Sequence, residues 1–236
     1  MRKSGKKITC YTEVAYFVAL YLLALGTSLS EKAGLGLSMI VAPAYIIYRR
    51  VSEIFPKFTF GMAEYIFQGI LLIILTLVMR KFKKGYLFSF VTAMVYGFML
   101  DFNTLWVRYL PGEGYFARLG YFFAGMFLCA TGVSFVFHTY ISPEVYELFV
   151  KEASAKFGIK IERVKIIYDC SSCILAIILS FLFFGFGEFV GIRQGTLLCA
   201  ALNGFLIGGI STILEKIFDF KDALPLRKWF EGAEPK

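Results

Sequence analysis

Apolar runs of membrane length constrain this chain more than any other feature. A helix that crosses a bilayer needs about 20 mostly apolar residues, and the sequence holds six runs of this kind, separated by charged segments. The hydrophobic share of 58% is high for a soluble domain. The sequence therefore predicts an all-α, polytopic membrane protein with six transmembrane helices, over Tyr11–Leu29, Phe60–Met79, Tyr86–Leu105, Tyr115–Phe137, Val164–Phe186 and Gly191–Ile213.

Two further segments are too broken or too charged to cross a membrane. Residues Ala33–Arg50 are apolar, but Gly34, Gly36 and Pro43 interrupt them, so we expect a re-entrant or interfacial helix there. Residues 142–158 carry too many charges for a span and predict an amphipathic helix. Each broken segment follows one apolar span and precedes the next.

The Lys and Arg residues indicate the orientation. With a cytoplasmic N-terminus and six spans, 18 of the 25 Lys and Arg residues lie on the cytoplasmic side and seven lie on the outer side. If residues 33–48 also crossed, the basic loop Arg80–Lys84 would move outside. The charge distribution therefore favours six spans with the N- and C-termini both cytoplasmic.

The two halves of the chain resemble one another. The sequence of Ala24–Ser28 resembles that of Ala130–Ser134, and a broken segment follows each, with Pro43 in the first half and Pro143 in the second. Further along, Phe60–Gln68 aligns with Ile161–Asp169, and the segment at Gly97 aligns with the one at Gly204. The matches occur in the same order, which indicates an internal duplication.

Three spans per unit would place the second unit upside down relative to the first. We therefore expect one membrane domain over residues 1–236, built of two inverted three-helix repeats, each with a broken re-entrant or interfacial helix. The repeats would cover residues 12–105 and 115–213, followed by a cytoplasmic tail over residues 214–236.

Polar side chains at helical spacing within the spans are the candidate site residues. In the stretch from Lys165 to Ser180, charged, polar and small residues recur every three or four positions, so they form one stripe on a helix. A charge in the bilayer centre costs about 2.5–3.5 kcal/mol on insertion scales, so this stripe should face protein or water. The alignment places Glu64 opposite Lys165, and Gln68 opposite Asp169.

We expect Glu64, Gln68, Lys165 and Asp169 to bind the substrate along a path between the repeats. Two other readings remain open: Glu64 and Lys165 lie near span ends, where they could reach the headgroups. Gln68 and Asp169 could instead hold helices together. Glu144 and Arg193 complete the candidate substrate-binding residues. The Glu144 carboxylate suits the start of a helix, whereas the Arg193 guanidinium suits an anionic group or a lipid interface.

Other classes of function find little support. The basic residues, which give a net charge of +8, lie between apolar runs, so membrane topology explains them without nucleic acid. The five cysteines are scattered and His138 is the one histidine, which predicts no metal site. Cys170 and Cys173 form a CxxC pair, but inert buried thiols explain it better than redox chemistry. We expect no enzyme and no cofactor, since no P-loop or nucleophile–base pair is present.

The second half, with Pro143-Glu144, Lys165-x3-Asp169 and Gly191–Thr196, resembles the YczE/YitT-like family of bacterial integral membrane proteins. The first half fits the same family through Ala33–Ser38 and Tyr45. The resemblance covers most of residues 12–213. It implies a multi-pass protein of the bacterial inner membrane, and it implies no particular substrate or reaction.

The sequence as a whole predicts a transporter or permease for a small polar or anionic solute, with its site between the two repeats. One alternative is a solute-binding membrane subunit that needs an energising partner, and a less favoured one is an intramembrane thiol redox enzyme. The expected partners are membrane lipids, the unidentified solute, and a second copy of the chain or a partner subunit.

Overall fold

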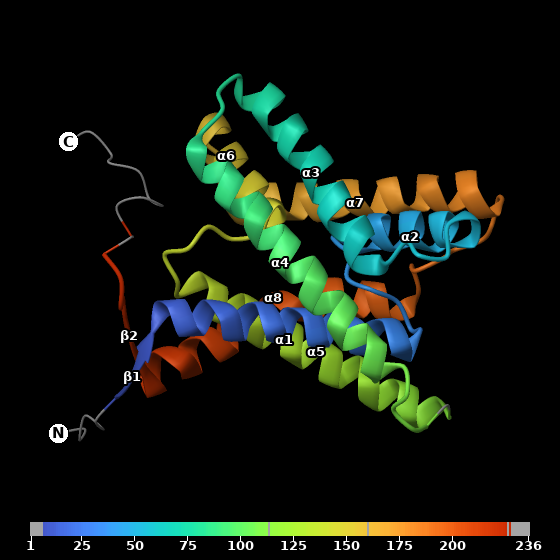
Figure 1. Ribbon diagram of the computed structural model, residues 1–236, viewed down its shortest axis with the longest axis horizontal. Coiled ribbons are helices and arrows are strands. Elements are labelled where there is room, and N and C mark those ends of the chain that lie inside the picture. Colours follow the sequence, from blue (N-terminus) through green and yellow to red (C-terminus); the bar gives the residue numbers. More distant parts are fainter. Residues whose placement is uncertain (1–6, 113, 160, 226, 228–236) are drawn as a thin grey trace.

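The computed structural model describes residues 7–112, 114–159, 161–225 and 227, which fold into long helices, two short helices and one pair of strands (Figure 1). Of the tail expected over residues 214–236, residues 226 and 228–236 lie outside the described part. The long helices are α1 (Thr12–Ala33), α3 (Phe60–Met79), α4 (Lys84–Val107), α5 (Tyr115–Phe137), α7 (Ile161–Phe184) and α8 (Gln194–Ile217). The short elements are α2 (Ala42–Ile54), α6 (Val145–Phe157), β1 (Ile8–Tyr11) and β2 (Phe218–Lys221).

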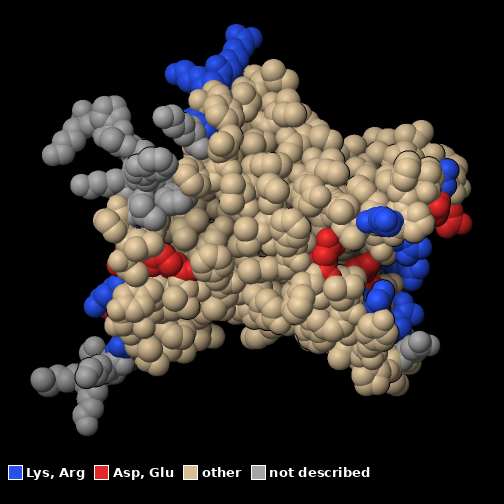
Figure 2. All heavy atoms as spheres, viewed as in Figure 1, with Lys and Arg blue, Asp and Glu red and all other residues tan. Residues whose placement is uncertain are grey.

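Five helices are long and apolar enough to cross a membrane, which fits a multi-pass membrane protein. They are α1, α3, α5, α7 and most of α4. The sixth expected span corresponds to α8, which is bent by 44° between Ala200 and Leu202 and counts as a span only if both parts are taken together. Figure 2 shows charged side chains gathered toward the ends of the molecule, with an uncharged band between them on this face.

Some helix boundaries differ from the expected ones, because the local backbone conformation starts or ends the helix at a different residue. The first helix runs on to Ala33, because Gly34 adopts a left-handed conformation that ends it there. The last helix begins at Gln194 instead of Gly191, since Gly191 has a φ of 75° and Arg193 is extended. The first broken segment forms a helix only from Ala42, with Pro43 in its first turn.

The antiparallel pair α1 and α5 lies at the centre of the bundle. A side chain at Gly26 would collide with the backbone at Gly125 and with Cys129, and one at Gly132 would collide with the backbone at Ala19. Close contact between these two helices therefore depends on small residues, as is common in membrane proteins. The helix α4 packs against α1, and α8 packs against α5.

The short helices connect the two halves. The helix α2 packs against α7 in the second half, and α6 packs against α3 in the first half. In Figure 1, α4 runs diagonally across α1, with α3 and α6 beside it. The order of one long helix, one 13-residue helix and two long helices thus occurs twice along the chain.

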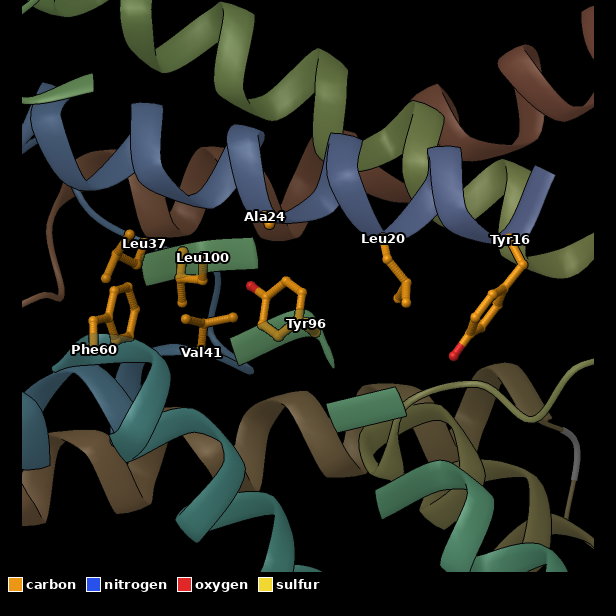
Figure 3. Packing of buried hydrophobic residues seen from close by; sticks show 8 residues of the cluster. All are labelled: Tyr16, Leu20, Ala24, Leu37, Val41, Phe60, Tyr96 and Leu100. Carbon is orange, nitrogen blue, oxygen red and sulfur yellow. The ribbon is translucent and has the colours of Figure 1, made fainter. Parts of the chain in front are cut away.

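Aromatic and aliphatic side chains fill the space between α1 and α4 (Figure 3). Tyr16 and Leu20 of α1 point toward this layer, where Tyr96 and Leu100 of α4 are also buried. Two hydrogen bonds cross it, from Tyr16 to Thr92 at 2.7 Å and between Thr27 and Tyr96 at 2.9 Å. Each buried hydroxyl group is satisfied by the facing helix, which offsets the free energy of removing it from water.

The strands were not expected from the sequence. Residues 8–11 pair in parallel with residues 218–221, so the segment before α1 lies beside the segment after α8. We refer to this end of the bundle, where α1 begins and α8 ends, as the clasp end. The turn at Gly34 and the start of α8 lie together at the opposite end, where Gly195 N donates to Leu35 O.

Candidate functional site

The candidate site begins with two polar residues on α3. Glu64 and Gln68 are four positions apart and therefore lie on one face of the helix, and both are fully buried. The opposite face carries exposed apolar side chains such as Ile66, Ile73 and Leu77. Thr59 caps the start of the helix by accepting a hydrogen bond from Met62 N. The sequence pattern thus directs the polar face of α3 toward the protein and its apolar face outward.

The start of α6 meets this polar face. Gln68 Nε2 donates to Glu144 Oε2 at 3.0 Å, and Gln68 Oε1 accepts from Val145 N at 3.1 Å. Tyr146 donates its hydroxyl hydrogen to Glu64 Oε2 at 2.8 Å. One amide therefore both caps the first turn of α6 and binds its Glu144 carboxyl group. We name Glu64, Gln68, Glu144 and Tyr146 the acid site.

The acid site holds two carboxyl groups without a neighbouring cation. Within the described residues, no Lys, Arg or His side chain forms an ion pair with Glu64 or Glu144. Glu64 Oε1 is buried and has no hydrogen-bond partner in that part of the chain. An isolated charge removed from water is strongly unfavourable. This arrangement therefore suits a carboxyl group that is protonated or that binds a cation.

The N-terminal ends of the two short helices approach each other beside the acid site. Ala44 of α2, Phe67 of α3 and Tyr146 of α6 share one buried cluster, and Tyr168 of α7 packs against it. The first turn of a helix carries a partial positive charge, which favours a carboxylate at Glu144. The broken segments expected from the sequence thus bring two helix starts into the interior of the bundle.

A second group of charges lies next to the acid site on α6 and α7. Lys165 Nζ and Asp169 Oδ1 are 3.4 Å apart, with about a third of each side chain exposed. Glu147 interacts electrostatically with both residues and also with Glu144. Together with Leu23, Val133 and Val136, the two glutamates Glu144 and Glu147 line a small cavity. A series of ionisable groups therefore leads from the half-exposed Lys165–Asp169 pair to the buried acid site.

The polar stripe expected on α7 faces the bundle for most of its length. Ser172, Ala176 and Ser180 are buried, whereas Ile174 and Ile178 are exposed. Cys170 is exposed, Cys173 is half-buried, and both are free thiols. Lys165 and Asp169 are the members of the stripe that interact with Glu147 beside the acid site.

The structure brings together five of the six residues proposed from the sequence. Arg193 is the exception, because it lies at the opposite end of the bundle, where its Nη1 donates to Gly34 O at 3.0 Å. Arg118 donates to the same carbonyl oxygen at 3.1 Å. Both guanidinium groups therefore bind the backbone at the turn that ends α1.

Tyr146 and Glu147 are not among the site residues that the sequence pattern predicts. Both follow Pro143 and Glu144 within the amphipathic segment, so a polar cluster at a helix start was the available signal. Charges in that segment indicated only that it does not cross the membrane. Their contacts with α3 and α7 depend on how α6 folds back into the bundle.

The described residues contain no group of three or more His, Cys, Asp or Glu side chains that could hold a metal ion. The acid site offers two carboxyl groups, one amide and one phenol. A proton is the simplest cation that such a set accepts.

Fold and site together define a multi-pass helical membrane protein with a buried acidic centre. The chain belongs to DUF6198, a family of unknown function, whose model matches residues 10–212. This match agrees with an uncharacterised family and does not confirm the narrower resemblance to YczE/YitT-like proteins. The comparisons with curated proteins and with solved structures gave no match.

Proposed function

We propose that this protein is a proton-coupled membrane transporter for a small polar solute, and that Glu64 and Glu144 exchange a proton during its cycle. The observation that carries the proposal is the acid site. Two buried carboxyl groups share one amide, and Glu64 Oε1 has no hydrogen-bond partner among the described residues. A carboxyl group that gains and loses a proton at membrane depth is typical of transport proteins.

The acid site narrows the class of solute. An anion would meet like charges there whenever either carboxyl group is ionised, so a neutral polar or cationic solute fits better than an anionic one. Glu147, Lys165 and Asp169 would carry protons between the acid site and the clasp end. The charge distribution of the loops supports a cytoplasmic location for the clasp end, and the resemblance supports a bacterial inner membrane.

The two-repeat architecture is part of this proposal. Ser28 Oγ donates to Ala24 O and Leu100 O, and Ser134 Oγ donates to Ala130 O and Ile207 O. These contacts correspond in the alignment of the two halves, in which Ser28 matches Ser134. The equivalent packing of α2 on α7 and α6 on α3 adds support. In inverted-repeat transporters, the substrate site lies between the repeats.

The small cavities provide further support for a pseudo-twofold relation. One cavity is lined by Thr27, Ser30 and Cys129, together with residues of the first broken segment. At the positions that align with these three, Val133, Val136 and Leu23 line the other cavity, together with Glu144 and Glu147 of the second broken segment. The two cavities therefore occupy matching places on either side of the α1–α5 pair, and the second has acidic side chains.

The first test measures protonation directly. Infrared spectra of the purified protein should contain the carbonyl band of buried protonated carboxyl groups at neutral pH. That band should weaken in Glu64→Gln and in Glu144→Gln. Glu152→Gln is the matched control, because Glu152 lies on α6, which begins next to Glu144, and pairs with Lys83. Equal spectra for the parent and both site variants would contradict the proposal.

The second test measures transport. Proteoliposomes containing a pH-sensitive dye are exposed to gradients of neutral, cationic and anionic small solutes. We expect proton movement with one neutral or cationic solute, and loss of that movement in Glu144→Gln but not in Glu152→Gln. Solute uptake without proton movement would contradict the proposal that transport is coupled to protons.

A further inference from the structure

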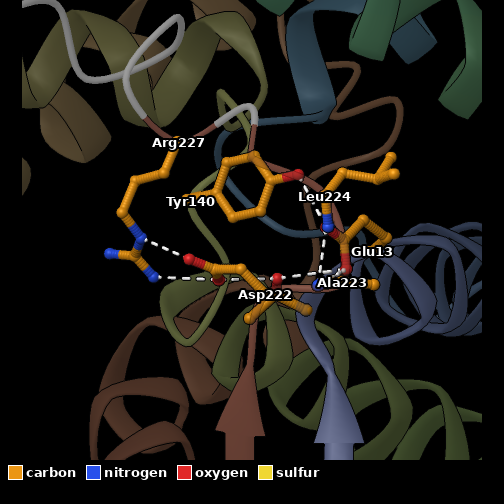
Figure 4. Close-up of polar contacts among 7 residues, drawn as sticks. Glu13, Tyr140, Asp222, Ala223, Leu224 and Arg227 are labelled. Carbon is orange, nitrogen blue, oxygen red and sulfur yellow. Dashed lines mark hydrogen bonds and ion pairs between the residues drawn. The ribbon is translucent and has the colours of Figure 1, made fainter.

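We propose that a set of contacts at the clasp end forms a strap that closes access to the acid site. The strap consists of Glu13, Tyr140, residues 222–224 and Arg227 (Figure 4). The inference relies on the proposed function only for the role of the site that the strap covers. The closure itself concerns access and is tested without any transport measurement.

Glu13 is the centre of the strap. Its carboxylate accepts hydrogen bonds from Ala223 N at 3.0 Å and from Leu224 N at 2.9 Å. Tyr140 donates its hydroxyl hydrogen to the same carboxylate at 2.7 Å. One side chain in the first turn of α1 thus holds both the segment after β2 and the connection between α5 and α6.

Asp222 secures the other side of the strap. Arg227 Nε donates to Asp222 Oδ2 at 2.7 Å, and Thr12 donates to Asp222 Oδ1 at 3.0 Å. The Arg227 guanidinium also lies over the Tyr140 ring, 5.6 Å from its centroid. The parallel pairing of β1 with β2 continues these contacts from Lys221 back to Phe218 at the end of α8. Charge-assisted hydrogen bonds of this kind are stronger than neutral ones.

The position of Tyr140 connects the strap to the acid site. Tyr140 lies four residues before Glu144, and between them Ser142 O accepts a hydrogen bond from Thr92 at 3.1 Å. The cavity beside Glu144 and Glu147 is walled by α1 and α5, through Leu23 and Val136. The strap ties the start of α1 to the chain that follows α5. Opening the strap would therefore let those walls separate and would admit water to Glu144.

The experiment measures access to the cavity. Val136→Cys supplies a reporter thiol on the cavity wall, and a hydrophilic maleimide labels the protein in nanodiscs. Labelling at position 136 is counted by mass mapping, so the native cysteines are kept. In Glu13→Gln/Asp222→Asn, we expect labelling about tenfold faster than in the parent, because the uncharged side chains weaken the charge-assisted hydrogen bonds of the strap.

Asp219→Asn is the matched control, since Asp219 lies on β2 and pairs with Lys221 outside the strap. Its labelling rate should equal that of the parent. An equal acceleration in the control, or a parent-like rate in Glu13→Gln/Asp222→Asn with an unchanged circular dichroism spectrum, would overturn the proposal.

A second variant works in the opposite direction. Cys10 faces Phe220 in the strand pairing, and neighbouring strands lie about 4.8 Å apart, so Phe220→Cys should form a disulfide with Cys10. Oxidation should slow labelling at position 136, and a reductant should restore the rate. Equal labelling rates in the oxidised and reduced forms would overturn the strap proposal. The acid-site proposal would not be affected by that result.

Discussion

Glu13 and Glu64 each accept a hydrogen bond from a tyrosine hydroxyl group, yet Glu64 is fully buried, Glu13 is only partly buried, and their other partners differ. Glu13 accepts from Tyr140 and from two backbone N–H groups. Glu64 accepts from Tyr146 at 2.8 Å and from Gln68 at a long 3.5 Å, and its second oxygen has no partner among the described residues. The first carboxylate is satisfied by its neighbours, as in a structural contact, and the second is left to be completed by a proton or a ligand.

The largest expected effect comes from Gln68→Leu, which removes the group shared by both carboxyls. The change removes the Gln68 donor from both Glu144 and Glu64, and it removes the acceptor of Val145 N, while Tyr146 still donates to Glu64. Each buried polar group left unsatisfied costs about 1–3 kcal/mol, so we expect a loss of unfolding free energy of at least about 2 kcal/mol. Thermal unfolding in detergent measures this loss.

Thr76→Val on the same helix is the control for Gln68→Leu. In the part of the chain that the structure describes, Thr76 Oγ1 bonds only to Leu72 O within α3, so its removal should change the unfolding free energy by less than about 0.5 kcal/mol. If the two variants lost similar stability, the shared-amide role of Gln68 would be wrong.

A matched tyrosine pair sharpens the comparison. Tyr146→Phe removes the one short hydrogen bond to Glu64, and Tyr140→Phe removes one of three donors to Glu13. We expect Tyr146→Phe to lose about 1–3 kcal/mol and Tyr140→Phe about half of that, since Glu13 keeps two backbone donors. Unfolding midpoints of both variants measure the difference, and equal losses would remove the distinction between the two carboxylates.

The smallest effect concerns pH at the strap. Hydrogen bonds from Arg227 hold the pKa of Asp222 below its ordinary value of 3.8. A carboxyl group with a lowered folded-state pKa stabilises the fold above its unfolded pKa, and this contribution is lost as the pH falls through the folded-state pKa. The parent should therefore be more stable than Asp222→Asn at neutral pH, and the gap should close below about pH 4.

Unfolding midpoints of the parent and Asp222→Asn over a series of pH values check this prediction. Asp219→Asn again serves as the control, because its contact with Lys221 is exposed. A stability gap that stays constant down to the acid range would show that the charge on Asp222 contributes nothing to the strap. The neighbouring Tyr140 does not complicate the result, since burial and the bond to Glu13 raise its pKa to about 12.

Much of the architecture could be predicted because it depends on local spacing. The apolar runs placed five of the membrane-length helices within a few residues of their observed bounds. Helical periodicity placed Glu64 and Gln68 on one face, and both are buried as a polar face within a membrane requires. Three boundaries were missed at Gly34, Gly191 and Ala42, where turn conformations override the apolar pattern.

The acid site could be predicted only in part. Glu144 was a candidate, but the pattern did not indicate that it would contact Gln68, which lies 76 residues earlier in the chain. Arg193 was grouped with the other candidates, although the fold places it at the opposite end of the bundle. Sequence spacing does not determine such distances, because they depend on where each broken segment turns back.

The sequence by itself determined the class of this protein and the faces of its helices. Apolar length and helical period act within one segment, and the bilayer penalises any polar face that is left uncovered. The tertiary structure alone decided that α6 enters the bundle at Glu64, and that the segment after α8 binds Glu13 about 210 residues away. These contacts form only after the helices have packed, because they join groups that no local pattern brings together.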